Sequence, residues 1–474
     1  MKKLFALILI SLPMWCMAQK KMPATALQSD ASLLWQSLNE LHPGMYRHVD
    51  TTDLVSGYEK LLEEFSVDRT QEEAFKNFSE FVVKIKCGHT YLNPFNQPSK
   101  LIDSIIADPV LLPFSFRIIE NKIIVDSSRT EKINSSAIIK CINDIPVATI
   151  IDSLSHYVKA DGNRMAKKKK NLEVSFGSKY NYFDYYFPLI YGFRDSVSVE
   201  LEDGDIVSVP LFDKKLRDSK GLGTISYDDM WSYTLEENYA YLKLGTFVTW
   251  KMTFDWESYL DNFFKELDRR KIKNLIIDIR DNEGGLTEVT DYLTKKLAKD
   301  KGKLVPRRKY LAYRKVSDNL RPHLSTWSKW FYNITLWTKK YDDHYRTPRF
   351  SKVEKTIKEN PKAYEGETFL LINEANSSAT FILAENCEVN NYATLVGTET
   401  GGTKMGITGG QIFFLTLPNT KIEIDIPLIG LYPTTDLADE GILPDISIPV
   451  TLNDFRLKMD SQLRYIIENL IVEN

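Results

Sequence analysis

Hydrophobic and polar side chains follow different spacings in successive parts of the chain. From about residue 25 to residue 86, apolar positions recur every three or four residues, which predicts amphipathic helices. From about residue 110 to residue 212, short apolar runs are separated by turn residues, which predicts strands joined by tight turns at 143–144 and 203–204. The first region is therefore expected to be helical and the second to be rich in β-structure.

A third region alternates strands with helices. A predicted strand at 239–247 is followed by a helix at 255–270, a strand at 274–280 and a helix at 286–299. The alternation resumes with the strand 367–372, which is followed by another apolar helix. The strand at 274–280 begins almost uniformly apolar, as expected for a strand that is covered on both faces. This rhythm predicts an α/β domain.

Chain length supports several structural units, because 474 residues exceed the size at which a single core stops growing. Residues 301–364 are crowded with Lys, Arg, Trp and Tyr, which indicates a surface insertion over the α/β layer or, less commonly, a segment that faces substrate. The expected parts are an export signal at 1–18, a helical region at 19–109, a β-rich module at 110–212, an α/β domain at 213–451 and a C-terminal helix at 452–474.

The first residues, MKKLFALILISLPMWCMAQK, have the features of an export signal. Two lysines precede an apolar run that is too short to span a bilayer, and Cys16 and Ala18 are the small residues expected before cleavage at Gln19. The residues before Cys16 suit a lipid anchor poorly. No later segment reaches the ~18 uninterrupted apolar residues of a transmembrane helix. We therefore expect a soluble protein in the periplasm or outside the cell.

Charge and cysteine content argue against a nucleic-acid binder, a metal site built on cysteines and a disulfide-rich protein. The formal net charge of −3 has no global electrostatic footprint, which argues against a dedicated nucleic-acid binder. After cleavage, Cys87, Cys141 and Cys387 remain, and their spacing is not that of a metal site. An odd number of thiols cannot form a complete disulfide framework, so we expect each to be a buried free thiol.

The stretch NEANSSATFILAEN, residues 373–386, places two serines between a strand-like run and a helix. Asn376 or Ser377 would be an ordinary helix cap, the commoner role for such residues at this boundary. Ser378 would alternatively be a nucleophile on a strand-to-helix turn, where backbone N–H groups converge.

Two other segments carry residues that such a nucleophile needs. His89, in KIKCGHTYL, follows a helical pattern and titrates near neutral pH, as a general base should, although a single loop histidine is more often structural. Gly284 and Gly285, in LIIDIRDNEGGL, allow a close backbone approach that would aim an N–H group at an oxyanion, whereas the simpler interpretation is a plain turn. The glycine spacing does not match a phosphate-binding fingerprint.

Further candidates lie nearer the C-terminus. Lys404, in VGTETGGTKMGITGGQ, would serve as an alternative base if burial removed its proton, but such a lysine is more often solvated. Asp439, Glu440 and Asp445, in ADEGILPDISI, would offer a carboxylate to orient a base, but an exposed acidic turn is the commoner case.

The ordered set CGHT, IDIRDNEGG, NSSAT, VGTETGG and GILPD resembles the C-terminal processing (tail-specific) and tricorn-like serine peptidases. The resemblance spans most of the mature chain and implies a Clp-protease/crotonase-like catalytic domain, a helical N-terminal segment and a PDZ-like module that matches SAIIKCINDIPVATII. The segment LHPGMYRH is similar to the N-terminal portion of exported Bacteroidetes-type members.

Residue by residue, the resemblance implies His89 as the base and Ser378, the serine followed by alanine, as the nucleophile. Ser377 then becomes the capping neighbour. The oxyanion donors would be the N–H of Ala379 and an N–H in Gly284-Gly285. Lys404 lies near the lysine of the tail-specific branch, but one residue late and without the usual following pattern, so it remains the alternative base.

Three positions depart from the family pattern. Phe381 stands where members commonly have Glu, Gly88 where the tricorn-like branch can have Ser, and Ala438 where an orienting Glu is expected. Asp439 or Glu440 would be substitutes, so the acid that orients the base stays unassigned.

The resulting hypothesis is an exported serine-type peptidase that needs no metal or organic cofactor. Its PDZ-like module would receive a protein or peptide substrate, with a free C-terminus as one possibility, by adding it as a strand. The alternative is a catalytically inactive, peptide-binding homologue that retains the fold. A sugar-processing enzyme is not supported, because no pair of carboxylates forms a motif.

Overall fold

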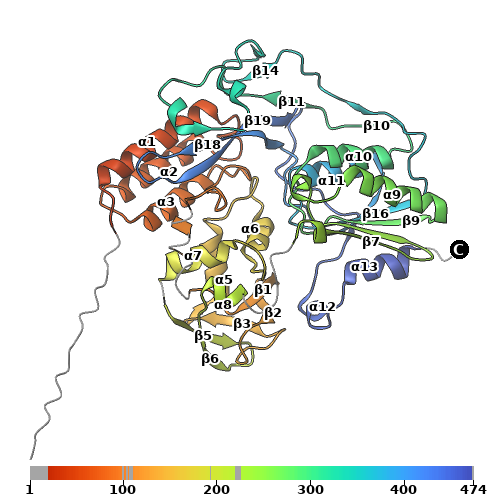
Figure 1. Ribbon diagram of the computed structural model, residues 1–474, viewed down its shortest axis with the longest axis horizontal. Coiled ribbons are helices and arrows are strands. Elements are labelled where there is room, and N and C mark those ends of the chain that lie inside the picture. Colours follow the sequence, from red (N-terminus) through yellow and green to blue (C-terminus); the bar gives the residue numbers. More distant parts are fainter. Residues whose placement is uncertain are drawn as a thin grey trace, which may run out of the picture.

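The computed structural model describes residues 20–98, 101–102, 105, 110–192, 194–218 and 226–471. The predicted export signal at 1–18 lies outside these residues. Figure 1 shows the helical region, the β-rich module and the α/β domain as three groups of elements that meet near the middle of the molecule.

Three amphipathic helices form the N-terminal region, as the apolar spacing predicted. They are α1 (Ala24–Leu41), α2 (Thr51–Glu64) and α3 (Gln71–Val83). Helix α3 begins with a capping box, in which the Thr70 side chain accepts from the backbone of Glu73 and the Glu73 side chain accepts from the backbone of Thr70. Their buried faces belong to one core that continues into the β-rich module.

A four-stranded antiparallel sheet from the C-terminal half of the chain packs against these helices. Its order is β11-β19-β18-β12, with β11 (Arg307–Tyr310), β12 (Leu324–Ser325), β18 (Ile407–Thr416) and β19 (Glu423–Pro433). Figure 1 shows β18 and β19 beside α1 and α2. Part of the basic, aromatic segment 301–364 thus joins this sheet through β11 and β12.

The rest of the segment 301–364 forms two short pairs of strands. They are β10 (Gly302–Lys303) with β15 (Thr356–Ile357), and β13 (Thr338–Lys340) with β14 (Arg346–Pro348).

The β-rich module is built on an antiparallel sheet of order β1-β2-β3-β5-β6, with β4 paired to β3. The predicted turns at 143–144 and 203–204 are confirmed. Asn143 and Asp144, which have positive φ angles, join β3 to β4, and the turn at Gly204, also with a positive φ, joins β5 to β6. The elements are β1 (Phe114–Ile119), β2 (Lys122–Ser128), β3 (Ile138–Ile142), β4 (Ile145–Pro146), β5 (Ser196–Leu201), β6 (Ile206–Pro210), α5 (Val147–Ser155), α6 (Met165–Leu172), α7 (Tyr182–Tyr191) and α8 (Lys214–Asp218).

The α/β domain has a sheet of order β20-β17-β16-β9-β8-β7, parallel except for β7 with β8. Helices α9, α10 and α11 cover one face, and α13 with the following residues covers the other. The elements are β7 (Trp231–Leu235), β8 (Ala240–Leu244), α9 (Trp256–Arg270), β9 (Asn274–Asp278), α10 (Thr287–Leu297), β16 (Glu367–Ile372), α11 (Ala379–Asn390), β17 (Thr394–Gly397) and β20 (Ile446–Ser447).

All five residues of β9 are buried, which confirms the prediction of a strand covered on both faces. The parallel strands β9 and β16 are neighbours, so their carboxyl ends meet at one edge of the sheet. The segments 281–285 and 373–378, which follow these two strands, therefore lie at the same edge.

The C-terminal segment contains short helices rather than the single helix expected from residue 452 onward. They are α12 (Leu452–Arg456), α13 (Ser461–Tyr465) and a π turn (Ile466–Leu470). The interruption has a local cause, because Asp460 accepts a hydrogen bond from the backbone of Leu463 and so starts a new helix.

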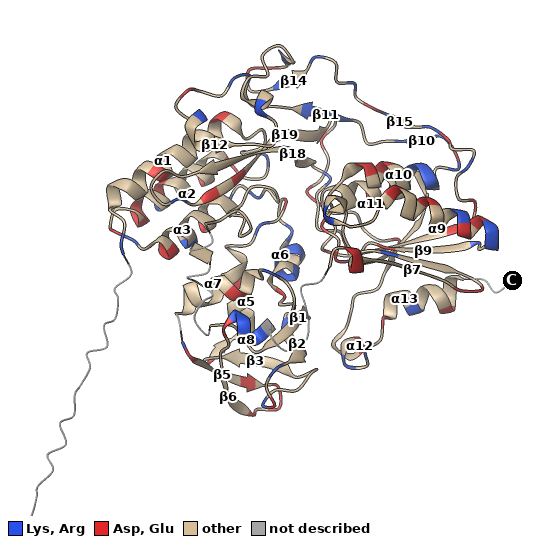
Figure 2. Cartoon of the chain, in the orientation of Figure 1, with Lys and Arg blue, Asp and Glu red and all other residues tan. Residues whose placement is uncertain are grey.

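The remaining expectations concern thiols, charge and membranes. Cys87 and Cys387 are buried free thiols, whereas Cys141 is only half-buried, because it lies on β3 away from the module's core. Figure 2 shows that basic and acidic residues are interspersed along the ribbon in all parts of the molecule. No helix within the described residues is long and apolar enough to cross a membrane.

Asp30 joins α1 to the turn between β18 and β19. Its carboxylate is fully buried and accepts hydrogen bonds from the backbone N–H groups of Asn419 and Thr420. We expect Asp30→Ala to lower the free energy of unfolding by about 2–4 kcal/mol, because two backbone N–H groups, that of Thr420 buried, lose their acceptor. Chemical denaturation measures the change, with the exposed Glu59→Ala as the control; equal effects of both substitutions would contradict the role of Asp30.

Candidate active site

Ser378 occupies a strained turn between β16 and α11. Its φ and ψ angles are +54° and −123°, a region that residues other than glycine rarely adopt. Ser378 is partly exposed, whereas Ser377 before it and Ala379 after it are buried. Strain at a single exposed serine in a strand-to-helix turn is typical of a nucleophile that must project from the backbone.

The predicted helix cap is wrong. Helix α11 starts after Ser378, and no side chain accepts a hydrogen bond at its N-cap. Asn376 instead donates to the carbonyl groups of Ile279 and Asn282, and Ser377 Oγ donates to the carbonyl of Glu283 at 3.2 Å. Both side chains thus face the neighbouring turn, and Asn376 Oδ1 accepts from the N–H of Asn373 rather than from the first turn of α11.

The glycine turn 281–285 lies directly against the serine. A Cβ atom on Gly284 would be 2.9 Å from both the Cβ of Ser378 and the nitrogen of Ala379. The N–H of Gly284 donates to Asn282 Oδ1 at 2.8 Å. Among the described residues, the N–H groups of Gly285 and Ala379 have no acceptor. One unpaired N–H group thus follows Ser378 directly, and a second belongs to the residue after Gly284, which contacts the serine turn.

His89 reaches the same corner from the loop after α3. It lines a cavity of about 40 Å³ together with Ser377 and Glu283. Its Nδ1 is buried and has no hydrogen-bond partner within the described part of the chain. Burial lowers the pKa of His89, and the nearby carboxylate of Asp161 opposes this effect. The imidazole is therefore held in its neutral form around neutral pH.

Four further lining residues come from the β-rich module and were not identified from the sequence: Lys159, Ala160, Asp161 and Lys167. Lys167 is almost completely buried, donates to the carbonyl of Ala375 at 2.7 Å and lies 3.2 Å from Glu283 Oε1. Burial lowers its pKa. Asp161 accepts a hydrogen bond from the N–H of Gly88 at 2.7 Å. Lys167 belongs to a run of four lysines that predicts a solvated helix face, so no local signal marks it as buried.

Lys404 lies away from the cavity that His89 lines beside the serine turn. Its Nζ is 3.2 Å from Glu388 and 3.2 Å from Glu440. Glu388 is ten residues along α11 from Ser378, a distance of about 15 Å at the rise of an α-helix. Although partial burial lowers the pKa of Lys404, these two carboxylates outweigh that effect and raise it.

The acidic element near the C-terminus makes structural contacts. Asp439 accepts from the backbone and side chain of Asn163, and Asp445 accepts from the backbone of Leu395. Phe381 is completely buried and packs against Gly402. Within the described residues, no three His, Cys, Asp or Glu side chains lie together in a way that could hold a metal ion.

Comparison with known proteins identifies a family match for most of the α/β domain. Residues 238–448 match the model of Peptidase family S41. The chain carries an S41 peptidase domain. This domain, the catalytic unit of a serine-type peptidase, runs from β8 to β20 and contains the glycine turn, Ser378 and Lys404. His89 comes from outside it.

Solved structures of CPAF share the fold at low sequence identity. Mature CPAF complexed with lactacystin has a TM-score of 0.63 and 14% identity, with 94% of this chain and 98% of that chain covered. Mature CPAF alone has a TM-score of 0.62 and 15% identity, with the same coverage. The photosystem II D1 C-terminal processing protease is similar at a TM-score of 0.40 and 13% identity, over 90% of this chain and 94% of that one. Among curated proteins, none matches the chain.

A methyl group on Gly284 would displace the serine turn. Gly284 has φ +102°, and its Cβ would also lie 2.8 Å from the carbonyl oxygen of Ser377. We expect Gly284→Ala to lower the melting temperature and the rate of labelling of Ser378 by a serine-directed probe. Gly204→Ala is the matched control, because Gly204 has a similar φ of +95° with no atom within 4 Å. Equal effects at both positions would show that backbone strain alone, rather than contact with the serine turn, is responsible.

Proposed function

We propose that the protein hydrolyses peptide bonds with Ser378 as the nucleophile and His89 as the general base. The observation that carries this proposal is the strained, partly exposed Ser378 at the uncapped N-terminus of α11, inside an S41 domain. Ser378 Oγ attacks the scissile carbonyl and gives its proton to His89. His89 then gives a proton to the leaving amine, and water releases the acyl group by the same steps.

The oxyanion of the tetrahedral intermediate would be stabilised by backbone N–H groups. Ala379 and either Gly284 or Gly285 are the candidates. Because the N–H of Gly284 already donates to Asn282, the proposal takes Gly285 as the donor from the turn. The N-terminus of α11 adds a partial positive charge at the same place.

His89 suits the role of base better than Lys404. His89 is neutral and lines a cavity with the serine turn, whereas Lys404 is held in its charged form by Glu388 and Glu440. A charged lysine has no lone pair to accept a proton. Lys167, although its pKa is lowered, donates to the carbonyl of Ala375, so the proposal gives it a positioning role.

The substrate would be an extended protein or peptide chain. A cavity of about 450 Å³ lies between the β-rich module and the S41 domain, and Glu283 and Ala375 beside the serine turn form part of its wall. A PDZ-like function of the module, with capture of a free C-terminus by strand addition, is part of this proposal. The proposal also places the protein in the periplasm or outside the cell, on the support of the leader-like sequence at 1–18.

A catalytically inactive homologue is the second candidate. Two observations favour it: His89 Nδ1 has no acceptor among the described residues, and Phe381 fills a buried position where related peptidases commonly have Glu. Without an acceptor on Nδ1, nothing holds the imidazole in one tautomer.

Labelling with a fluorophosphonate separates the two candidates. We expect wild-type protein and Ser377→Ala to be labelled and to cleave an unstructured protein such as casein, because Ser377 is buried and bonded to Glu283. Ser378→Ala should lose labelling and at least about 10³-fold in kcat, since it removes the nucleophile. Absence of labelling in the wild-type protein would support the inactive homologue.

The pH profile tests the base. Burial lowers the pKa of His89 below its ordinary 6.5. A base must be unprotonated to act, so the acidic limb of kcat/KM should lie below pH 6.5. Asp161→Asn removes a negative charge that raises this pKa, and should move the limb to still lower pH while the amide oxygen keeps the bond to Gly88. Asp439→Asn should leave the limb in place, and a shift with Asp439→Asn alone would make Asp439 the relevant acid.

A further inference from the structure

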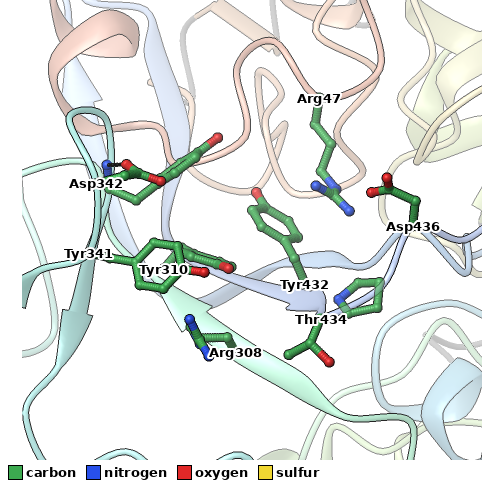
Figure 3. A pocket seen from close by; sticks show the side chains of 10 residues that line it. Arg47, Arg308, Tyr310, Tyr341, Asp342, Tyr432, Thr434 and Asp436 are labelled. Atoms are coloured by element: carbon green, nitrogen blue, oxygen red, sulfur yellow. Dashed lines mark hydrogen bonds between the residues drawn. The ribbon is translucent and has the colours of Figure 1, made fainter.

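A second cavity lies away from the serine turn, between the N-terminal loop and the segment 301–364. Its volume is about 280 Å³. Figure 3 shows its lining, which is dominated by tyrosine rings and two arginines. The walls come from four separate segments: Arg47, then Arg308 and Tyr310 on β11, Tyr341 to Tyr345 between β13 and β14, and Tyr432 to Asp436 at the end of β19.

The two guanidinium groups are positioned by aromatic rings. The Arg308 Cζ lies 4.4 Å from the centre of the Tyr341 ring, and the Arg47 Cζ lies 4.1 Å from that of Tyr432. Tyr310 contacts the Tyr341 ring edge-on at 5.2 Å and stacks on Tyr432 at 5.7 Å. The tyrosines thus form one continuous wall that holds both cations.

Arg308 has unused hydrogen-bonding capacity. It is half-buried, yet within the described residues its side chain makes no hydrogen bond or ion pair. Arg47 differs, because its Nε and one terminal nitrogen donate to the carbonyl of Met405. A guanidinium has five N–H donors in a planar fork that matches a carboxylate. Arg308 therefore presents an unoccupied fork to the cavity.

The carboxylates of the cavity do not neutralise Arg308. Asp342 accepts hydrogen bonds from the backbone N–H groups of His344 and Tyr345. These bonds stabilise the turn between β13 and β14. Asp436 is exposed and forms no ion pair with either arginine among the described contacts. An external anion is thus free to pair with Arg308.

We propose that this cavity binds a small aromatic carboxylate, with the carboxylate on Arg308 and the ring against the tyrosine wall. The volume corresponds to about nine liquid water molecules, which suits a single aromatic amino-acid unit. The same chemistry is carried by the C-terminal residue of a peptide ending in Phe or Tyr and by a free aromatic acid. This site is separate from the proposed catalytic serine, and its occupancy does not require peptidase activity.

One hydrogen bond connects the cavity to strand β18, which passes beside His89. The hydroxyl groups of Tyr432 and Thr408 lie 2.9 Å apart. The next residue, Gly409, faces His89, since a Cβ on it would be 3.7 Å from His89 Nε2. Ligand in the cavity therefore contacts a wall that continues, through β18, to the proposed base.

Calorimetric titration with three matched probes tests the proposal on the full chain. The first probe, N-acetylphenylalanine, has both the carboxylate and the ring. The second, N-acetylphenylalanine amide, lacks the charge, and the third, N-acetylalanine, lacks the ring. We expect N-acetylphenylalanine to bind at least about tenfold more tightly than either of the others, and more weakly at high salt. Equal binding of acid and amide, or no binding of the acid at millimolar concentration, would overturn the proposal.

Substitutions locate the binding. Arg308→Gln should raise the Kd for N-acetylphenylalanine at least about tenfold. Lys309→Gln, at the adjacent exposed position of β11, should leave it unchanged. Both variants should keep the wild-type melting temperature, and an unchanged Kd in a folded Arg308→Gln variant would refute the site. Phenylacetate and the peptide Ala-Ala-Phe distinguish the two sources: tighter binding of the peptide indicates a peptide end, and tighter binding of phenylacetate indicates a free acid.

Discussion

The parallel pairing of β9 with β16 is the constraint on which the rest of the site depends. Asp278 at the end of β9 pairs with Leu371 near the end of β16, so both chains leave the sheet at the same edge. The glycine turn and the serine turn are almost a hundred residues apart in sequence and become neighbours for this reason alone. Asn282 and Asn376, both fully buried, then join the two turns by hydrogen bonds.

The need to satisfy buried polar groups explains why the helix N-terminus is open. Carbonyl groups of the turn 279–283 lie in the interior and accept hydrogen bonds from Asn376, Ser377 and Thr380. These side chains face the turn and none of them caps α11, so the first N–H groups of the helix remain available to a ligand. The same bonds hold Ser378 in a backbone conformation that an isolated serine would avoid.

The β-rich module contributes charged side chains to the candidate active site that the S41 domain does not supply. A lysine as buried as Lys167 is costly unless it is paired, and here it finds Ala375 and Glu283. Asp161 of the same module is bonded to Gly88, next to His89. The protonation of His89 therefore depends on how the module sits against the S41 domain, so movement of the module would change the site chemically as well as sterically.

Short-range patterns in the sequence determined much of this protein: the helices α1 to α3, the hairpin turns at 143–144 and 203–204, and the buried strand β9. Such patterns also marked the segments around His89, Gly284 and Ser378 as candidates. Each depends on residues close together in the chain, and spacing and turn chemistry report on such contacts directly. The cap at Asn376 or Ser377 was a reasonable local prediction, but buried carbonyl groups of a distant turn compete for those side chains. Only the tertiary structure decided the partners of Lys404, the burial of Lys167, and the joining of β11 and β12 to the sheet over the N-terminal helices. These features arise from contacts between residues tens to hundreds of positions apart, which no local pattern encodes.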